Sequence, residues 1–295
     1  MLKRIFLLVL CCLCLPAGVD ASETSTFSFQ PKRVVTKAYG IWGPPALNLL
    51  LPGFDQFYEG QTGAGLTYFG LAALGMNIYR SYGSGKIETE KNPKENARDS
   101  LGYAALGGSL YQNTSFMSAY HSFATSVQTR PDDFSFIQKQ DSPADLALAP
   151  FDFRFLRRSS TYIPLGIIAG FLALSYRGIR GEDSIMTARS LLSFEERFAS
   201  VLGLSFGAAV GEEALFRGWL LPAFRYSLGS KRFANVAQSI IFGLAHYGPE
   251  NPAPVVQTLL GYYWGSLTER AGYSMREAVF QHYWWDAMIF ATAGF

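Results

Sequence analysis

The sequence is poor in charged residues, in histidine and in cysteine. Only 16% of its 295 residues are Asp, Glu, Lys or Arg, and the net charge is +2, whereas about 25% charged residues is usual in a soluble protein. Intrinsic disorder requires low hydrophobicity and high net charge, so this composition excludes a disordered chain. The small net charge, without a strong basic patch, argues against a nucleic-acid-binding protein.

The only three cysteines lie close to the N-terminus, at Cys11, Cys12 and Cys14. They fall in or beside an apolar run that follows two basic residues, and residues 1–21 have the pattern of a secretory signal peptide cleaved after Ala21. An uncleaved anchor is the alternative, although the apolar core is short for a span of ~20 residues. After cleavage no cysteine would remain, which would exclude disulfides, thiolate zinc sites and a cysteine nucleophile.

Apolar and aromatic residues are abundant instead: 49% of the chain is hydrophobic and 15% is aromatic. Several apolar segments approach the roughly 17 to 25 residues that a helical membrane span requires. These segments are residues 62–78, 101–127, 161–176, 198–222, 233–247, 254–267 and 278–295. We therefore expect an all-α fold, a polytopic transmembrane helical bundle with the lipid bilayer as a partner. A signal peptide followed by several helices is typical of a bacterial inner-membrane protein.

A polar stretch, residues 128–158, separates two parts of the chain. We predict an N-terminal membrane-associated region over residues 22–150, with Gly/Pro-rich apolar segments and polar loops, and a C-terminal transmembrane domain over residues 151–295. Within the first region, residues 38–60 contain Gly-Pro-Pro and Pro-Gly sequences. Because Pro breaks helices and Gly permits tight turns, we expect a bent or re-entrant apolar segment there.

An unusual cluster of charges lies near the end of segment 198–222, where Glu212 and Glu213 are followed by Arg217. Ionisable groups in an apolar helix are costly and usually face the interior of a helical bundle. Glu213 and Arg217 are four residues apart and can pair on one helix face, whereas Glu212 is turned away by about 100°. Glu212 is therefore the less neutralised carboxylate and the better general base. An ordinary Glu–Arg pair at a helix end is the structural alternative.

Two of the three histidines follow in the next apolar segments. His246 ends a Phe-Gly-Leu-Ala-His sequence, and His282 shares a helix face with Asp286, four residues later. Each histidine taken alone can be a structural residue of the core. Together with Glu212, however, they would form an acid–base group that can activate water and stabilise an oxyanion. For His121, in the weakly apolar segment 101–127, we expect a structural role.

These residues resemble, in order and spacing, the motifs of the CPBP family of intramembrane proteases, also called the Abi family or type II CAAX prenyl proteases. That family carries Glu-Glu-x-x-x-Arg, then Phe-x-x-x-His, then His-x-x-x-Asn/Asp on successive membrane helices. The matching positions here are Glu212, Glu213 and Arg217, then Phe242 and His246, then His282 and Asp286. The resemblance begins near residue 161 and implies that residues 151–295 are a CPBP-like catalytic domain.

The resemblance implies a membrane-embedded endopeptidase that acts on a peptide or protein substrate at or in the membrane. A glutamate-activated water, rather than a covalent intermediate, would attack the peptide bond. Glu212 would be the general base and His246 would help to position the water. Glu213 and Arg217 would support the site, and His282 would stabilise the tetrahedral oxyanion together with the residue at position 286.

Asp286 differs from the Asn that many relatives have at this position. An Asn side chain donates hydrogen bonds readily, whereas an ionised Asp only accepts them. Asp286 therefore either carries a proton or orients His282 instead of acting as a direct oxyanion donor.

Two alternatives concern the cofactor and the function. Glu212, His246 and His282 could ligate zinc as a His₂Glu site, but the sequence lacks a His-Glu-x-x-His motif. The glutamate mechanism needs no metal, so we expect no cofactor. A non-catalytic membrane binding, transport or scaffold protein is the other candidate function, because intramembrane ionisable groups also mark proton relays and ligand sites.

Overall fold

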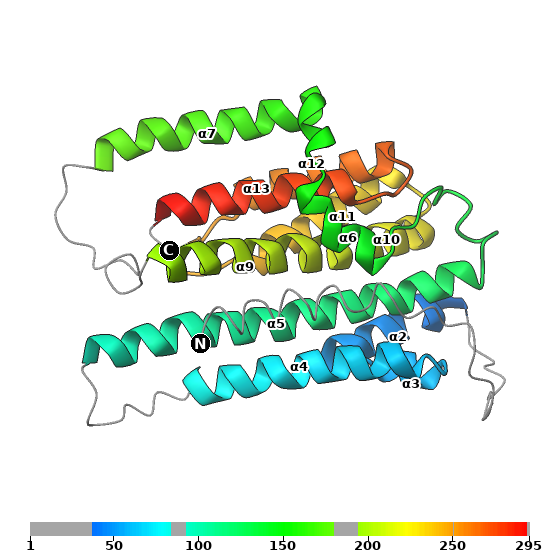
Figure 1. Cartoon of the computed structure of the whole chain (residues 1–295). Helices are drawn as coiled ribbons and strands as arrows, with labels where there is room; N and C mark the ends of the chain where they lie inside the picture. The colour runs from blue at the N-terminus through cyan, green and yellow to red at the C-terminus, as the bar shows by residue number, and fades with distance from the viewer. Residues whose placement is uncertain (1–36, 84–92, 180–193, 250, 294–295) are drawn as a thin grey trace.

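The computed structural model describes residues 37–83, 93–179, 194–249 and 251–293 (Figure 1). The predicted signal peptide, residues 1–21, lies outside the described residues. All the elements in these ranges are helices, and apart from one isolated bridge between Gly248 and Asn251 the described residues contain no β-structure. The predicted all-α fold is confirmed.

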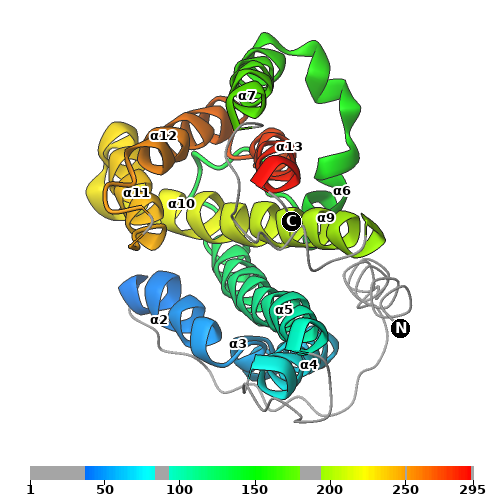
Figure 2. The ribbon, with the colours of Figure 1, turned by 90° about the vertical axis from the view of Figure 1, so that its left-hand side faces the viewer.

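The helices are arranged in three layers, which Figure 2 shows nearly end-on. The first layer contains α2 (Lys37–Leu50), α3 (Phe54–Tyr58), α4 (Thr62–Gly83) and α5 (Pro93–Gln128). The middle layer is one continuous run of α9 (Phe194–Glu213), a π-helical segment η4 (Ala214–Leu220) and α10 (Leu221–Leu228). The third layer contains α7 (Ser159–Ile179), α11 (Lys231–Ala245), α12 (Val255–Arg270) and α13 (Arg276–Ala293). The middle run packs against α5 on one side and against α11 and α13 on the other.

The polar stretch between the two parts of the chain folds into α6 (Pro143–Leu148) and two short 3₁₀ helices, η2 (Ala149–Phe151) and η3 (Phe153–Arg157). Asp152 pairs with Arg154 of η3 at 2.7 Å and with Arg276, the first residue of α13, at 3.1 Å. The hydrogen bond from Arg154 lowers the pKa of Asp152. This carboxylate therefore fixes the connecting segment to the start of α13.

The expected bend in residues 38–60 lies after α2. α2 ends at Leu50, and Gly53 has a φ of +89°, a backbone conformation that glycine adopts without steric penalty. A Cβ atom at Gly53 would also lie only 2.4 Å from the backbone oxygen of Gly65, so α3 and α4 meet closely at this turn.

The Pro44–Pro45 pair does not break the segment, contrary to our expectation, and lies inside α2. A proline has no N–H, so the carbonyls four residues earlier, those of Gly40 and Ile41, lose their helical donors. Side chains from other helices replace them. Ser126 of α5 donates to the Gly40 oxygen at 2.6 Å, and the indole of Trp219 in η4 donates to the Ile41 oxygen at 2.8 Å. The helix continues because no freed carbonyl is left without a donor.

Several helices begin or end away from the apolar segments. Residues 79–83 and 93–100, which lie between two of the apolar segments, belong to α4 and α5, whereas His246 lies one residue beyond α11. Polar residues such as Lys, Glu and Arg are good helix formers, so a helix can extend past its apolar run.

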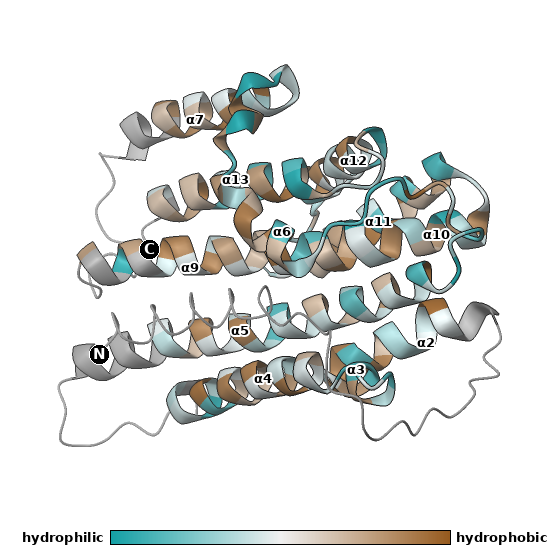
Figure 3. Ribbon diagram, turned by 45° about the vertical axis from the view of Figure 1, so that its right-hand side comes forward, coloured by the Kyte–Doolittle hydropathy of each residue, from teal (hydrophilic) through white to brown (hydrophobic). Residues whose placement is uncertain are grey.

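Large apolar side chains are exposed on several helices, among them α4, α7, α11 and α12. They include Leu66, Phe69, Ile163, Ile167, Phe171, Leu174, Val236, Ile240, Leu244, Val256 and Leu259. Figure 3 shows hydrophobic residues recurring along α4 and α7. Exposed apolar surface on this scale is unusual for a soluble monomer and marks contact with a membrane or a partner. Within the described ranges, no helix combines the length and the apolar character that crossing a membrane demands.

Candidate active site

The charged cluster lies where the middle run of helix changes its winding. Glu212 and Glu213 end α9, and Arg217 lies within the π-helical segment η4. π-helical turns are rare and are frequent at functional sites. Arg217 Nη1 donates to Glu213 Oε1 at 3.0 Å, and both side chains are fully buried. The predicted pairing of Glu213 with Arg217 is confirmed.

Arg217 is surrounded by groups that compensate its buried charge. Its Nη2 donates to the Gly261 carbonyl at 3.2 Å, and its guanidinium carbon lies 4.3 Å from the ring centroid of Phe242 and 5.5 Å from that of Trp264. Aromatic faces attract cations, and additional hydrogen bonds offset part of the cost of a buried ion pair. The Nε donor of Arg217 has no hydrogen-bond partner among the described residues. Arg217 thus connects η4 to both α11 and α12.

His282 of α13 meets the same carboxylate from the other side. Its Nδ1 lies 2.9 Å from Glu213 Oε1, while its Nε2 lies 3.4 Å from Asp286 Oδ2 and 3.9 Å from Glu212 Oε2. Both ring nitrogens therefore face carboxylate oxygens, which accept hydrogen bonds but do not donate them when ionised. This arrangement favours the doubly protonated, cationic ring.

His246 faces Glu212 from the end of α11. Its Nδ1 lies 2.8 Å from the Phe242 carbonyl oxygen, and because a carbonyl only accepts, Nδ1 carries the hydrogen. In the neutral ring this leaves Nε2 as an acceptor, 3.7 Å from Glu212 Oε2. Asn251 donates to the His246 carbonyl at 3.0 Å and holds the loop that follows. Two acceptors at this separation can each receive one hydrogen of the same water molecule.

The structure thus brings all six predicted site residues together, in two groups that differ in burial. The side chains of Glu213, Arg217 and His282 are at most 4% exposed, and they form an inner group. Those of Glu212, His246 and Asp286 are 17%, 32% and 18% exposed. The three residues of the outer group are therefore the more accessible to a substrate.

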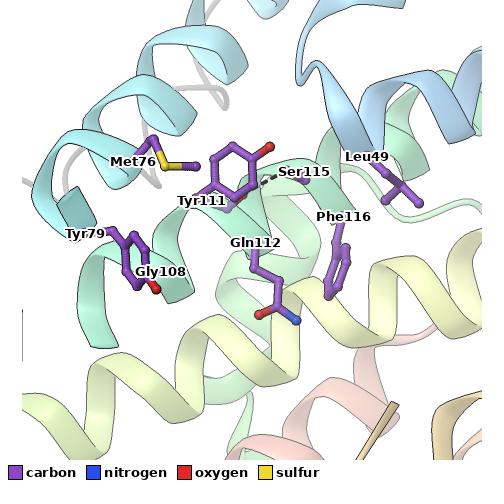
Figure 4. A pocket seen from close by; sticks show the side chains of 8 residues that line it. All are labelled: Leu49, Met76, Tyr79, Gly108, Tyr111, Gln112, Ser115 and Phe116. Atoms are coloured by element: carbon purple, nitrogen blue, oxygen red, sulfur yellow. Dashed lines mark hydrogen bonds between the residues drawn. The ribbon is translucent and has the colours of Figure 1, made fainter. Parts of the chain in front are cut away.

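The remaining histidine lies elsewhere. His121 belongs to α5, and its Nδ1 is 3.1 Å from the hydroxyl oxygen of Tyr68 in α4. A cavity of about 340 Å³ between α2, α4 and α5 is also separate from the charged cluster (Figure 4). The lining of this cavity is mostly apolar and aromatic, and it contains none of the six site residues. It consists of Leu49, Met76, Tyr79, Gly108, Tyr111, Gln112, Ser115 and Phe116.

In the part of the chain that the structure describes, no group of three or more His, Cys, Asp or Glu side chains is arranged to hold a metal ion. A histidine must be neutral at the coordinating nitrogen to bind a metal. His282 faces carboxylates through both ring nitrogens, which disfavours that state.

Our sequence reasoning missed Trp264, whose ring is stacked on His282 with the centroids 4.3 Å apart and an angle of 21° between the planes. The available signal was the spacing of Gly261 and Gly265 around it. A Cβ at Gly265 would lie 2.0 Å from Asn235 Oδ1, and one at Gly261 would lie 3.2 Å from Phe242 Cδ1. These glycines let α12 approach α11 closely.

Comparison with known proteins gives one match. Residues 194–288 match the family model described as type II CAAX prenyl endopeptidase, Rce1-like. No curated protein and no solved structure matches the chain. The matched segment starts at the first residue of α9, ends within α13 and includes all six site residues. The resemblance seen in the motifs is confirmed over residues 194–288, which match the model of the type II CAAX prenyl endopeptidase family.

Proposed function

We propose that the protein is an endopeptidase in which Glu212 activates a water molecule for attack on a peptide bond. The observation that carries this proposal is the position of Glu212 Oε2, which lies 3.7 Å from His246 Nε2 and 3.9 Å from His282 Nε2. The family match supports peptidase activity and peptide substrates. A carboxylate beside two imidazoles is the kind of acid–base group that general-base hydrolysis requires.

In the proposed reaction, the water donates one hydrogen to Glu212 Oε2 and the other to His246 Nε2. Glu212 takes up a proton while the water oxygen bonds to the carbonyl carbon of the substrate, which creates a tetrahedral oxyanion. The protonated Glu212 then gives its proton to the leaving nitrogen, and the carbon–nitrogen bond breaks. No covalent bond forms between enzyme and substrate. Glu212 Oε2 has no hydrogen-bond partner among the described residues, which suits this role.

His282 supplies positive charge where negative charge develops on the substrate oxygen. Positive charge that is fixed before the reaction stabilises such an oxyanion strongly. In this proposal Asp286, 3.4 Å from Nε2, accepts from His282 and orients it rather than donating to the oxyanion. Glu213 and Arg217 hold the opposite edge of the imidazole ring.

We place the reaction at or in the membrane, with the helices forming a polytopic bundle. Three observations support this location: the family match, the signal-like residues 1–21, which suit a bacterial inner membrane, and the apolar side chains exposed on α4, α7, α11 and α12. An exposed apolar surface of this kind is stable when lipid covers it. We also propose that hydrolysis proceeds without a metal.

The test is to substitute Glu212 and to follow cleavage. We expect Glu212→Ala and the isosteric Glu212→Gln to lower peptide hydrolysis by ~10²- to 10⁴-fold, the usual contribution of a general base. Uncut precursors should accumulate in the membrane proteome of cells that carry Glu212→Ala. Full activity of Glu212→Gln would refute the assignment of the general base. Wild-type protein that cleaves no offered peptide would instead favour a non-catalytic membrane protein.

A further inference from the structure

Two aromatic side chains, Phe242 and Trp264, contact both cations of the inner group. The ring of Phe242 meets that of His282 edge-on with the centroids 6.0 Å apart, whereas Trp264 lies parallel to it. Trp264 is only 2% exposed, its ring is stacked on His282, and it also lies 5.5 Å from the guanidinium carbon of Arg217. Arg217 and His282 share a single acceptor, Glu213 Oε1, at 3.0 and 2.9 Å. Trp264 is therefore packed against two donors that bind the same carboxylate oxygen.

The stack constrains a motion that the hydrogen bonds alone leave open. The terminal torsion of a histidine has a broad energy profile, so the ring can turn about its Cβ–Cγ bond at little cost. The bond to Glu213 holds Nδ1, but Nε2 is 3.4 Å from Asp286 and 3.9 Å from Glu212, which are long contacts. A nearly parallel indole at 4.3 Å fixes the plane of the ring, and its π-face also attracts a cationic imidazole.

We propose that Trp264 is a positioning residue for the hydrolysis, because its indole holds the plane of His282 so that Nε2 faces Glu212, Asp286 and the developing oxyanion. The inference rests on the proposed peptidase function. The orientation of the His282 ring, which the proposal attributes to Trp264, can also be tested without a substrate.

A second buried tryptophan provides a matched control. Trp219 is 3% exposed, lies in η4, and donates its indole N–H to the Ile41 carbonyl at 2.8 Å. Its ring packs against Trp42, with the centroids 6.0 Å apart. Substituting Trp219 therefore removes a comparable volume from the core but no contact with His282.

The first measurement compares Trp264→Leu, Trp264→Phe and Trp219→Leu in a peptide-cleavage assay, with rates corrected for the fraction of folded protein. We expect Trp264→Leu to lower kcat by ~10²-fold with little change in KM, since small displacements of catalytic groups have effects of that size. Trp264→Phe keeps an aromatic face and should recover most of the loss. Trp219→Leu should retain the wild-type kcat. Equal losses of kcat in both leucine variants, or no recovery with phenylalanine, would overturn the proposal.

The second measurement uses the imidazole nitrogen NMR signals of protein labelled with ¹⁵N-histidine, which contains only three histidines. Trp264→Leu should shift and broaden the signals of His282 and leave those of His121 unchanged, whereas Trp219→Leu should alter neither. Unchanged His282 signals in Trp264→Leu would overturn the positioning role even if the wild type is an active peptidase. If the His282 signals shift but the wild-type protein has no peptidase activity, Trp264 still positions His282 and the proposed reaction is refuted.

Discussion

The two halves of the molecule both bury polar side chains between helices, but they satisfy them differently. In α2–α5, Asp55 accepts from the Ser122 hydroxyl at 2.5 Å, and the amide of Gln56 both donates to and accepts from Ser118 at 3.1 and 3.0 Å. In the C-terminal half, Glu213 is shared by two cations, and three ionisable atoms in one cluster, Glu212 Oε2, Glu213 Oε2 and Arg217 Nε, lack a hydrogen-bond partner.

This difference separates a structural polar cluster from a candidate active site. Buried polar groups that neutral partners satisfy connect helices and specify their packing. Buried charges with unused hydrogen-bonding capacity are costly, and in a folded protein they indicate a group that acts on something else. Among the described residues of α2–α5, the unsatisfied buried side-chain atom is the neutral Asn48 Nδ2. The comparison therefore supports our proposal of a reaction at the junction of α9, α11 and α13 rather than in α2–α5.

The largest expected effects on activity come from substituting the histidines of the C-terminal half, with the histidine of the N-terminal half as the comparison. We expect His246→Ala and His282→Ala to lower kcat/KM for peptide cleavage by ~10²- to 10⁴-fold, because each removes an acid–base or electrostatic group beside Glu212. His121→Ala removes only the contact with Tyr68, so kcat/KM per folded molecule should stay unchanged. If His121→Ala abolished activity as well, the N-terminal cluster would belong to the active site.

A smaller effect should appear in stability when one carboxylate is neutralised in each half. Glu213→Gln leaves the fully buried Arg217 without its counter-charge, which should lower the free energy of unfolding by ~3–5 kcal/mol. Asp55→Asn weakens a hydrogen bond from Ser122 and should cost ~1–3 kcal/mol. Chemical denaturation in detergent micelles would measure both. The double variant Glu213→Leu/Arg217→Met should be more stable than Glu213→Gln; if it were less stable, the pair would be stabilising in itself.

The smallest expected effect is that of a chelator. If the unused carboxylate oxygen of Glu212 serves a water molecule directly, strong chelators should leave peptide cleavage unchanged. The same preparation should be measured before and after dialysis against the chelator, with a zinc protease treated in parallel. Activity that disappears and returns with added Zn²⁺ would show that the outer group of residues binds a metal.

The sequence alone predicts those features that local spacing controls. The all-α class follows from the lengths and apolar character of the segments, and the pairing of Glu213 with Arg217 follows from their separation of four residues. The convergence of three helices on Glu212 was a hypothesis from the two histidines in neighbouring apolar segments and from the family resemblance, because spacing within one helix carries no information on which helices become neighbours.

Other features escaped prediction for physical reasons. The π-helical winding of η4 and the stack of Trp264 on His282 depend on tertiary packing, which local propensity does not encode. The same holds for the Pro44–Pro45 pair, which reads as a helix break unless the donors that replace its missing N–H groups are known.

That proline pair also has a consequence for how the two halves are connected. Two carbonyls that an ordinary helix would use internally become docking points, one for Ser126 of α5 and one for Trp219 of η4. Trp219 is two residues from Arg217, so the first described helix is fastened directly to the segment that carries the buried guanidinium. A residue type known for interrupting helices here joins the N-terminal helices to the middle run of helix, and so contributes to the packing of the two halves.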